Sequence, residues 1–308
     1  MAASIDRMLG RLPEPVEARI RDRLGLDLFV VVASVLVVLR LFDESPWTPS
    51  VLDMHTYWAT RDGFSYQGDP YTIGAYLYAP VFAQLVAPLT ALPWPWFAAV
   101  WTAAIGATYI WLVGRWAFPL LLTGAVALEL YLGQIDIFLA AAVVIGFRYP
   151  VVWAFPLLTK IAPGIGLLWF LFRREWRNLA LALAATVGIA AVSALLMPEL
   201  WRSWYELLYR TVFERQAVDG AYLAIPVWLR LPIAVAVIFW GARTDRHWAV
   251  PIAVLLAMPI LWMNVFTLLL AIVPLREEPG LTPARAWLLR ERLLPSIPRV
   301  PDRVAPPA

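Results

Sequence analysis

Long apolar runs constrain this chain more than any other feature of its sequence. Six of them are candidates for full-length membrane crossings, the shorter ones being marginal: 24–42, 96–113, 117–132, 135–147, 178–197 and 222–242. A helix needs about 20 mainly apolar residues to cross the ~30 Å hydrocarbon core of a bilayer. Hydrophobic residues make up 61% of the chain and charged residues only 15%, against about 45–50% and 25% in soluble domains. The sequence therefore predicts an all-α, polytopic bundle of transmembrane helices in the cell membrane.

Three further apolar stretches are interrupted by proline or polar residues. They are 78–92 with Pro80 and Pro88, 149–172 with TKIAPG (159–164), and 248–275 with Pro251, Pro259 and WMN (262–264). Proline removes a backbone donor and clashes with the preceding helical turn. Irregular backbone at membrane depth is tolerated only where protein or a water-filled cavity satisfies it. We therefore expect several short or broken helices beside an outward-facing cavity.

Arginine placement predicts the orientation of the chain. Five Arg residues precede the first apolar run, whereas the loop that follows this run carries only Arg61 against five acids. Cytoplasmic loops are the ones enriched in Lys and Arg. The expected division is a cytoplasmic N-terminal segment (1–23), a transmembrane domain (24–275) with a first outer loop (43–77) and a second outer loop (198–221), and a cytoplasmic Pro/Arg-rich tail (276–308).

Most polar residues of the apolar part of the chain converge on one side in this topology. If 78–92 dips into the membrane without crossing it, then GQID (133–136), Lys160 and Asn264 lie on the same extracytoplasmic side as both outer loops. Polar groups inside a membrane are costly and usually face a cavity that uses them. One extracytoplasmic site is therefore expected.

Composition also excludes several classes of function. The net charge of +3 is too small to indicate a nucleic-acid partner. The chain has no cysteine, so no disulfide framework and no Cys metal site is available. His55 has no further ligands at a metal-binding spacing. We expect no metal, no cofactor and no nucleic-acid partner.

Asp53 and Lys160 are the strongest candidates for chemistry. A carboxylate at position 53, in the first outer loop, can accept a proton from a hydroxyl group at the membrane surface. A solvated loop acid or a helix cap is an equally good interpretation of Asp53. Lys160 is the only lysine, since the other 24 basic side chains are Arg. Its compact ammonium suits a phosphate, although a snorkelling side chain is the alternative.

The remaining polar residues are ambiguous from sequence. Gln134 and Asp136 follow Gly133 at a predicted turn between helices, where they serve structure as often as ligand binding. Glu129 is expected to hydrogen-bond a neighbouring helix. For His55, an interfacial side chain is a simpler interpretation than a proton relay.

An ordered series of segments resembles one protein family. It comprises DMHTYWA (53–59), GDPYT (68–72), YLYAPVFAQLVAPLTALP (76–93), GQIDIFL (133–139), LLTKIAPGIGLLWFLFRREWR (157–177) and MPILWMNVFTLLL (258–270). Together these segments resemble glycosyltransferase family 87, the polyprenyl-phosphate-mannose-dependent membrane mannosyltransferases. The likeness runs roughly from residue 50 to residue 275. One departure stands out, because the His that the family carries near its last helices is absent around Asn264.

The resemblance implies a fold, a reaction and site residues. The fold is the type-C glycosyltransferase fold, with an essential carboxylate in the first outer loop, where Asp53 stands. The donor is a polyprenyl-phosphate sugar, the acceptor a glycolipid or cell-envelope glycan, and the anomeric carbon is inverted. The expected roles are Asp53 as base, Lys160 and Gln134 at the donor phosphate, and His55, Tyr57, Trp58, Tyr78, Asp136 and Asn264 at the sugar or acceptor.

Two other functions fit the same sequence. A lipid or polyprenyl-sugar transporter also uses broken helices and buried charge, but we find no repeated half of the kind that many transporters contain. A non-catalytic assembly protein derived from the same fold agrees with the missing His.

Overall fold

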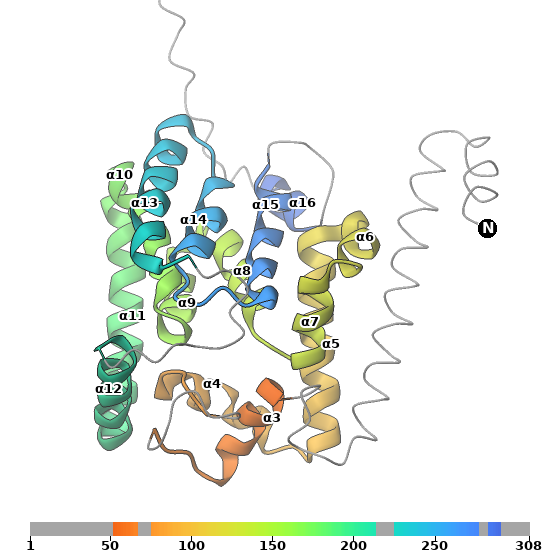
Figure 1. Cartoon of the computed structure of the whole chain (residues 1–308), viewed down its shortest axis with the longest axis vertical. Helices are drawn as coiled ribbons and strands as arrows, with labels where there is room; N and C mark the ends of the chain where they lie inside the picture. Colours follow the sequence, from red (N-terminus) through yellow and green to blue (C-terminus); the bar gives the residue numbers. More distant parts are fainter. Residues whose placement is uncertain (1–51, 67–74, 214–224, 277–282, 291–308) are drawn as a thin grey trace, which may run out of the picture.

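The computed structural model describes residues 52–66, 75–213, 225–276 and 283–290. Every regular element in these ranges is an α-helix or a 3-10 helix, and the described residues contain no strand. The prediction of an all-α membrane protein with several short or broken helices is therefore confirmed (Figure 1). The predicted crossing at 24–42 lies outside the described residues.

The helices follow one another along the chain. The first half contains α3 (Leu52–Ala59), η2 (Thr60–Asp62), α4 (Pro80–Thr90), α5 (Trp94–Val113), η3 (Gly114–Trp116), α6 (Ala117–Leu121), α7 (Gly124–Leu132) and α8 (Asp136–Gly146). The middle contains η4 (Pro150–Trp153), α9 (Ala154–Thr159), η5 (Ala162–Leu167), α10 (Leu168–Phe172), α11 (Trp176–Leu196) and α12 (Pro198–Phe213). The last part contains α13 (Val227–Thr244), α14 (Ala249–Ala257), η6 (Met263–Ala271), α15 (Ile272–Leu275) and α16 (Pro283–Arg290).

Three described helical stretches are long and apolar enough to cross a membrane. They are Trp94–Leu121, Trp176–Leu196 and Val227–Thr244. They contain or overlap the predicted crossings at 96–113, 178–197 and 222–242. The outer face of α11 exposes many large apolar side chains, among them Val187, Val192 and Leu195. Such a face is suited to lipid rather than to water.

The predictions of separate full-length crossings at 117–132 and 135–147 are wrong. The helix that begins at Trp94 continues only to Leu121, and α7 and α8 meet at an angle of 108°. Gly133 ends α7 in the left-handed region with φ 71°, a conformation that glycine adopts without steric cost. The 9 residues of α7 and the 11 residues of α8 are each too short to span a bilayer at 1.5 Å per residue. Together they form one broken crossing or a re-entrant pair.

The three stretches predicted to be broken are broken. Residues 78–92 form the short α4, which keeps Pro88 inside it. Residues 149–172 divide into η4, α9, η5 and α10, and residues 248–275 into α14, η6 and α15. Trp153 is fully buried, and its indole lies where Cβ atoms on Gly146 and Gly166 would overlap it. These two glycines therefore let η4 pack closely against α8 and η5.

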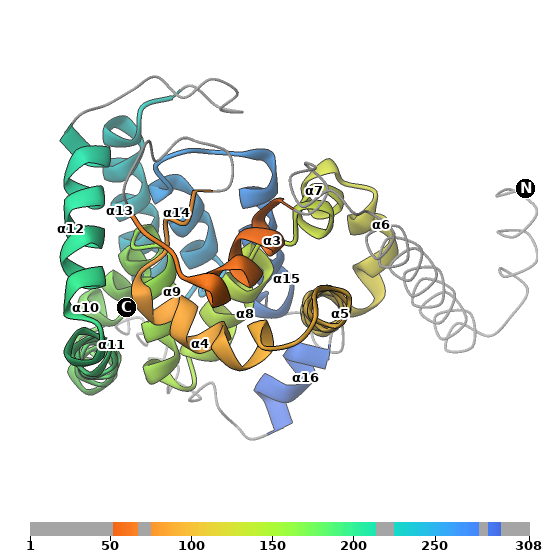
Figure 2. The ribbon, with the colours of Figure 1, turned by 90° about the horizontal axis from the view of Figure 1, so that it is seen from below.

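The helices have two distinct ends. Figure 2 shows α5 and α11 end-on, so they run roughly parallel, while α12 lies across them. The helices α3, α4 and α12 gather at the lower end in Figure 1, which we call the site end. The Trp204 indole of α12 donates to the Leu77 carbonyl oxygen at 3.2 Å and fixes α12 there. The first part of the predicted second outer loop thus forms a helix that lies across the long ones.

Arginine side chains mark the opposite end. Arg173, just before α11, donates to Glu175 at 2.7 Å and to Asp245, just after α13, at 2.8 Å. Its guanidinium also lies over the Trp169 ring, 5.3 Å from the ring centroid. These contacts join the α10–α11 turn to the end of α13, away from α3 and α4.

Arg230 holds the break between α14 and η6. Its guanidinium is buried and donates four hydrogen bonds of 2.8–3.0 Å to the carbonyl oxygens of Ile225, Leu256, Met258 and Pro259. These carbonyl groups include ones that α14 leaves without an intrahelical donor where it ends. The Arg230 side chain thus supplies hydrogen-bond donors to the carbonyl groups of the irregular segment that leads to η6.

Replacing Arg230 with Met is expected to lower the free energy of unfolding by about 1–3 kcal/mol, because buried carbonyl groups lose their donors. Unfolding of the purified protein in detergent measures this loss. Arg243, an exposed arginine of the same helix, gives the matched control, and Arg243→Met should change stability by less than about 0.5 kcal/mol. An equal effect of both substitutions would contradict the capping role.

Candidate active site

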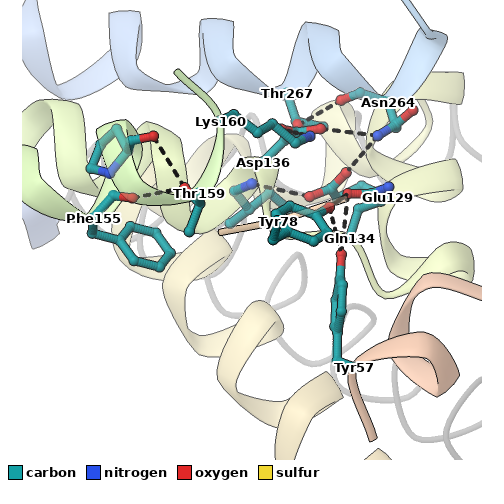
Figure 3. Close-up of polar contacts among 12 residues, drawn as sticks. Tyr57, Tyr78, Glu129, Gln134, Asp136, Phe155, Thr159, Lys160, Asn264 and Thr267 are labelled. Carbon is teal, nitrogen blue, oxygen red and sulfur yellow. Dashed lines mark hydrogen bonds and ion pairs between the residues drawn. The ribbon is translucent and has the colours of Figure 1, made fainter. Parts of the chain in front are cut away.

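The first half of the site comes from the short helix α3. Asp53 and Tyr57 are four residues apart, so they lie on the same face of the helix. Asp53 is half-buried, and Tyr57 is fully buried. The Tyr57 hydroxyl donates to Gln134, which lies far along the chain between α7 and α8 (Figure 3). Gln134 also lowers the pKa of Asp53.

Two tyrosines orient the Gln134 side chain. The hydroxyl groups of Tyr57 and Tyr78 lie 3.0 Å apart, and they donate to Gln134 Oε1 at 3.4 Å and 3.2 Å. Burial raises the pKa of both hydroxyl groups, so both remain protonated donors. With its oxygen accepting from the tyrosines, the Gln134 side chain also lowers the pKa of the Asp53 carboxyl group.

The bend at Gly133 explains why polar side chains stand at this point. The Trp101 indole donates to the Gly133 carbonyl oxygen at 2.8 Å, which fixes the turn against α5. Asp136 then occupies the first turn of α8, where a negative charge is favoured by the helix dipole. The same bend that shortens α7 and α8 therefore places Gln134 and Asp136 in the site.

The second half of the site is a buried chain of charged and amide groups. Lys160 Nζ donates to Asp136 Oδ1 at 2.6 Å, and Asn264 Nδ2 donates to Asp136 Oδ2 at 3.0 Å. Asn264 Nδ2 also lies 3.3 Å from Glu129 Oε2. The Asp136 side chain is completely buried, whereas 19% of the Lys160 side chain is exposed. Lys160 is therefore the member of this chain that a ligand can reach.

Asp53 and Lys160 are close enough to influence each other's charge. Burial raises the pKa of Asp53 to about 6, and the Lys160 ammonium and the Gln134 hydrogen bond act in the opposite direction. Nearby Asp136 adds to the increase. A carboxyl group with a pKa near 6 is ionised at neutral pH and still basic enough to accept a proton.

Most of the predicted site residues are brought together. Asp53, Tyr57, Tyr78, Gln134, Asp136, Lys160 and Asn264 belong to one connected cluster. His55 and Trp58 lie elsewhere, because their rings pack on Trp94 at centroid distances of 5.2 Å and 5.6 Å. The Trp58 indole donates to the Leu92 carbonyl oxygen at 2.9 Å. These two side chains therefore border a different part of the site end.

Glu129 is a fully buried member of this hydrogen-bonded network. The expectation that Glu129 hydrogen-bonds a neighbouring helix is confirmed, since its partner Asn264 belongs to η6. Glu129 Oε1 also accepts from the Ile137 amide at 3.1 Å. An acid in the middle of the apolar run VALELYL (126–132) is the sequence signal that marks Glu129 as part of a buried site.

Asp136 and Asn264 are buried, and their side chains are hydrogen-bonded to other residues of the protein. Asp136 has 0% and Asn264 4% of its surface exposed, and both carboxylate oxygens of Asp136 are occupied. A direct contact with sugar would have to displace these partners. Among the described residues, no group of three or more His, Cys, Asp or Glu is placed to hold a metal ion.

The fold and the site define a class of protein. A bundle of membrane-crossing and broken helices carries a half-buried carboxylate, a lysine and polar side chains at one end. Glycosyltransferase family 87 matches residues 76–284, which is more than half of the chain. The chain belongs to this family and is a membrane glycosyltransferase. No curated protein and no solved structure matched the chain.

The family match covers one half of the site and not the other. Gln134, Asp136, Lys160 and Asn264 lie inside the matched residues, whereas Asp53 and Tyr57 precede them. The evidence that Asp53 belongs to the site therefore comes from the structure and not from the family match. In the structure Asp53 lies near Gln134, a residue that the match includes.

Proposed function

We propose that this protein transfers a hexose, mannose being the sugar that the family resemblance favours, from a polyprenyl monophosphate to a glycolipid or cell-envelope glycan. The observation that carries the proposal is the pairing of Asp53 with Lys160. A base and a cation lie close enough for the Lys160 ammonium to lower the pKa of Asp53, and inverting transfer from a phosphate leaving group uses both kinds of group.

Asp53 is the proposed base. Its carboxylate takes the proton from the acceptor hydroxyl, and the acceptor oxygen forms a bond to the anomeric carbon. The bond between that carbon and the phosphate oxygen breaks with inversion. The polyprenyl phosphate leaves with the bonding electron pair, so it needs a nearby positive charge rather than a proton.

Lys160 is the proposed partner of that leaving group. Its ammonium has three N–H donors, and one of them goes to Asp136 at 2.6 Å. The other two N–H groups can donate to phosphate oxygens on the exposed side of the ammonium. Gln134 and Tyr78 are proposed to contact the phosphate and sugar. The fully buried Tyr57 is proposed to hold Gln134 in place, while His55 and Trp58 border the path of the acceptor.

Sugar transfer from a lipid-linked donor tests this function. Purified protein in proteoliposomes receives a radiolabelled polyprenyl-phosphate mannose together with an extract of envelope lipids. We expect label to move to a new lipid or glycan product, with polyprenyl phosphate released in equal amount. Transfer that proceeds from a nucleotide sugar alone, or release of sugar only to water, would contradict the proposal.

We also propose that the site end faces the outside of the cell and that the Arg173 end faces the cytoplasm. The cluster of arginines at the ends of α5, α11 and α13 away from the site supports this orientation. Because the chain has no cysteine, single cysteines report on it directly. Ser65→Cys should react with a membrane-impermeant maleimide in intact cells, and Arg246→Cys should react only after the membrane is opened.

The pH dependence of transfer follows from the pKa of Asp53. The base must be deprotonated, and its pKa lies near 6, so kcat/KM is expected to be level above this value. Below pH 6 kcat/KM should fall about tenfold for each pH unit, because the deprotonated fraction of Asp53 falls by that factor. A profile of kcat/KM between pH 4.5 and 8 measures this. A plateau that extends down to pH 4.5 would contradict Asp53 as the base.

A further inference from the structure

Two hollows flank α4 at the site end, and Gln84 lines both of them. The first has a volume of about 400 Å³, and its walls include Thr60, Arg61, Gln84 and Met197. The second has a volume of about 410 Å³ and lies between α4 and α11. Neither is lined by the residues of the Asp53–Lys160 cluster.

The first hollow is equipped for an anion. The Arg61 side chain is 37% exposed and gives one hydrogen bond of 3.3 Å to the Leu92 carbonyl oxygen. A guanidinium has five N–H donors, so most of them remain for a ligand. Among the described residues it pairs with the acid Asp62 at 3.8 Å, and Asp62 is 78% exposed, which makes it a weak partner in water.

Gln84 adds a second donor. Its Nε2 atom is buried and has no hydrogen-bond partner among the residues that the structure describes. A buried amide without a partner is destabilising, and native proteins rarely leave one. An acceptor from a ligand in the hollow would satisfy it.

The second hollow is apolar and opens toward lipid. Val81, Leu85, Ile189 and Val192 line it, and Ile189 and Val192 belong to the lipid-facing side of α11 with 45% and 60% of their surfaces exposed. Gly188 contributes no side chain to this wall, and a Cβ there would meet no atom within 4 Å. The groove therefore suits a hydrocarbon chain that arrives from the bilayer.

We propose that the two hollows form one site for an amphiphile, with its anionic head group at Arg61 and Gln84 and its hydrocarbon chain between α4 and α11. The bound amphiphile is the acceptor of the sugar, an assignment that rests on the proposed function. Arg61 follows directly on α3, the helix that carries Asp53, so a head group at Arg61 is next to the element that bears the base. The donor phosphate has its own cation in Lys160.

Labelling of single cysteines tests the binding site without any need for transfer activity. The chain has no cysteine of its own, so Leu85→Cys reports on the apolar groove and Ala91→Cys on the first hollow. The probe is dioleoyl phosphatidylglycerol in detergent micelles, with dioleoyl phosphatidylcholine and inorganic phosphate as comparisons. Leu122→Cys, on an exposed residue outside both hollows, is the reference for general coverage by lipid.

Phosphatidylglycerol is expected to slow maleimide labelling at both positions at least fivefold, with no effect at Leu122→Cys. Adding Arg61→Gln should remove most of this protection. Gly188→Leu, which fills the groove without a clash at Cβ, should also remove it, whereas Gly188→Ala should retain it. Equal protection by phosphatidylcholine would overturn the anionic head group. Protection of Ala91→Cys by inorganic phosphate alone, with none at Leu85→Cys, would overturn the amphiphile.

A kinetic comparison separates this proposal from the proposed function. Arg61→Gln should raise KM for the lipid acceptor about tenfold and leave kcat and KM for the donor unchanged. A higher KM for the donor would contradict the acceptor assignment even if lipid binds. Absence of sugar transfer by the unaltered protein would contradict the proposed function, while the labelling result would still decide whether the amphiphile site exists.

Discussion

Replacing Asp53 with Asn is expected to lower kcat for sugar transfer by about 10²–10⁴-fold, the usual contribution of a positioned general base. Asn keeps the size of the side chain and can still meet the Gln134 amide, so the fold should persist. The loss should therefore fall on kcat, with little change in KM for the donor. Initial rates of transfer from a radiolabelled lipid-linked donor give both quantities.

Asp62→Asn is the matched control, since Asp62 belongs to η2, directly after the same helix, and its side chain is 78% exposed. It should retain full activity. A loss at Asp53→Asn of less than tenfold, or an equal loss at both positions, would show that Asp53 does not act as the base.

The buried ion pair gives the second large effect. Asp136→Asn is expected to lower the free energy of unfolding by about 3–5 kcal/mol, because it leaves the ammonium of Lys160 without its carboxylate partner. Lys160→Met should have an effect of similar size, since it leaves Asp136 charged and completely buried. Unfolding in mixed micelles with increasing sodium dodecyl sulfate measures both losses.

The double variant Asp136→Asn with Lys160→Met separates stability from function. With both charges removed, most of the lost stability should return, whereas transfer should stay at least 100-fold below the unaltered protein because the leaving phosphate has lost its cation. The exposed pair Arg202–Glu206, 3.4 Å apart, is the control, and Glu206→Gln should change stability by less than about 0.5 kcal/mol. Activity restored by the double variant would rule out the proposed role of Lys160.

Much of the fold could be predicted because it depends on length and chain chemistry. Apolar runs near 20 residues long predicted helices at 96–113, 178–197 and 222–242, and helices are present there. The prolines of 78–92 and the TKIAPG segment predicted interruptions, because proline cannot donate a backbone hydrogen bond. These are local properties, and the sequence shows them directly.

The way in which residues 117–147 divide into short helices could not be predicted in the same way. Apolar composition is continuous there apart from a few residues, so hydropathy indicates two crossings. The 108° bend depends on Gly133 in the left-handed region and on the indole of Trp101, 32 residues away. Tertiary contacts of this kind decide the path of the chain, and a sequence window does not contain them.

The site shows the same contrast. The cost of burying polar groups correctly predicted that Gln134, Lys160 and Asn264 share one region. It did not identify their partners, and Lys160 proves to be held by Asp136 at 2.6 Å. For the short helix α3, spacing explains the outcome, since Asp53 and Tyr57 share one face while His55 and Trp58 point to Trp94. Helical periodicity could have separated these pairs once the helix was assumed.

Photolabelling with a lipid-linked sugar shows whether the reacting sugar phosphate binds at the Asp53–Lys160 cluster. The probe is a polyprenyl-phosphate hexose with a diazirine on the sugar, added to the protein in proteoliposomes and located by mass spectrometry of peptides. We predict labels in 52–60, 75–80 and 133–136, which unlabelled donor removes and Lys160→Met weakens. Labels confined to the Arg173 end, around 173–177 and 243–248, would show that the sugar phosphate does not bind at Asp53 and Lys160.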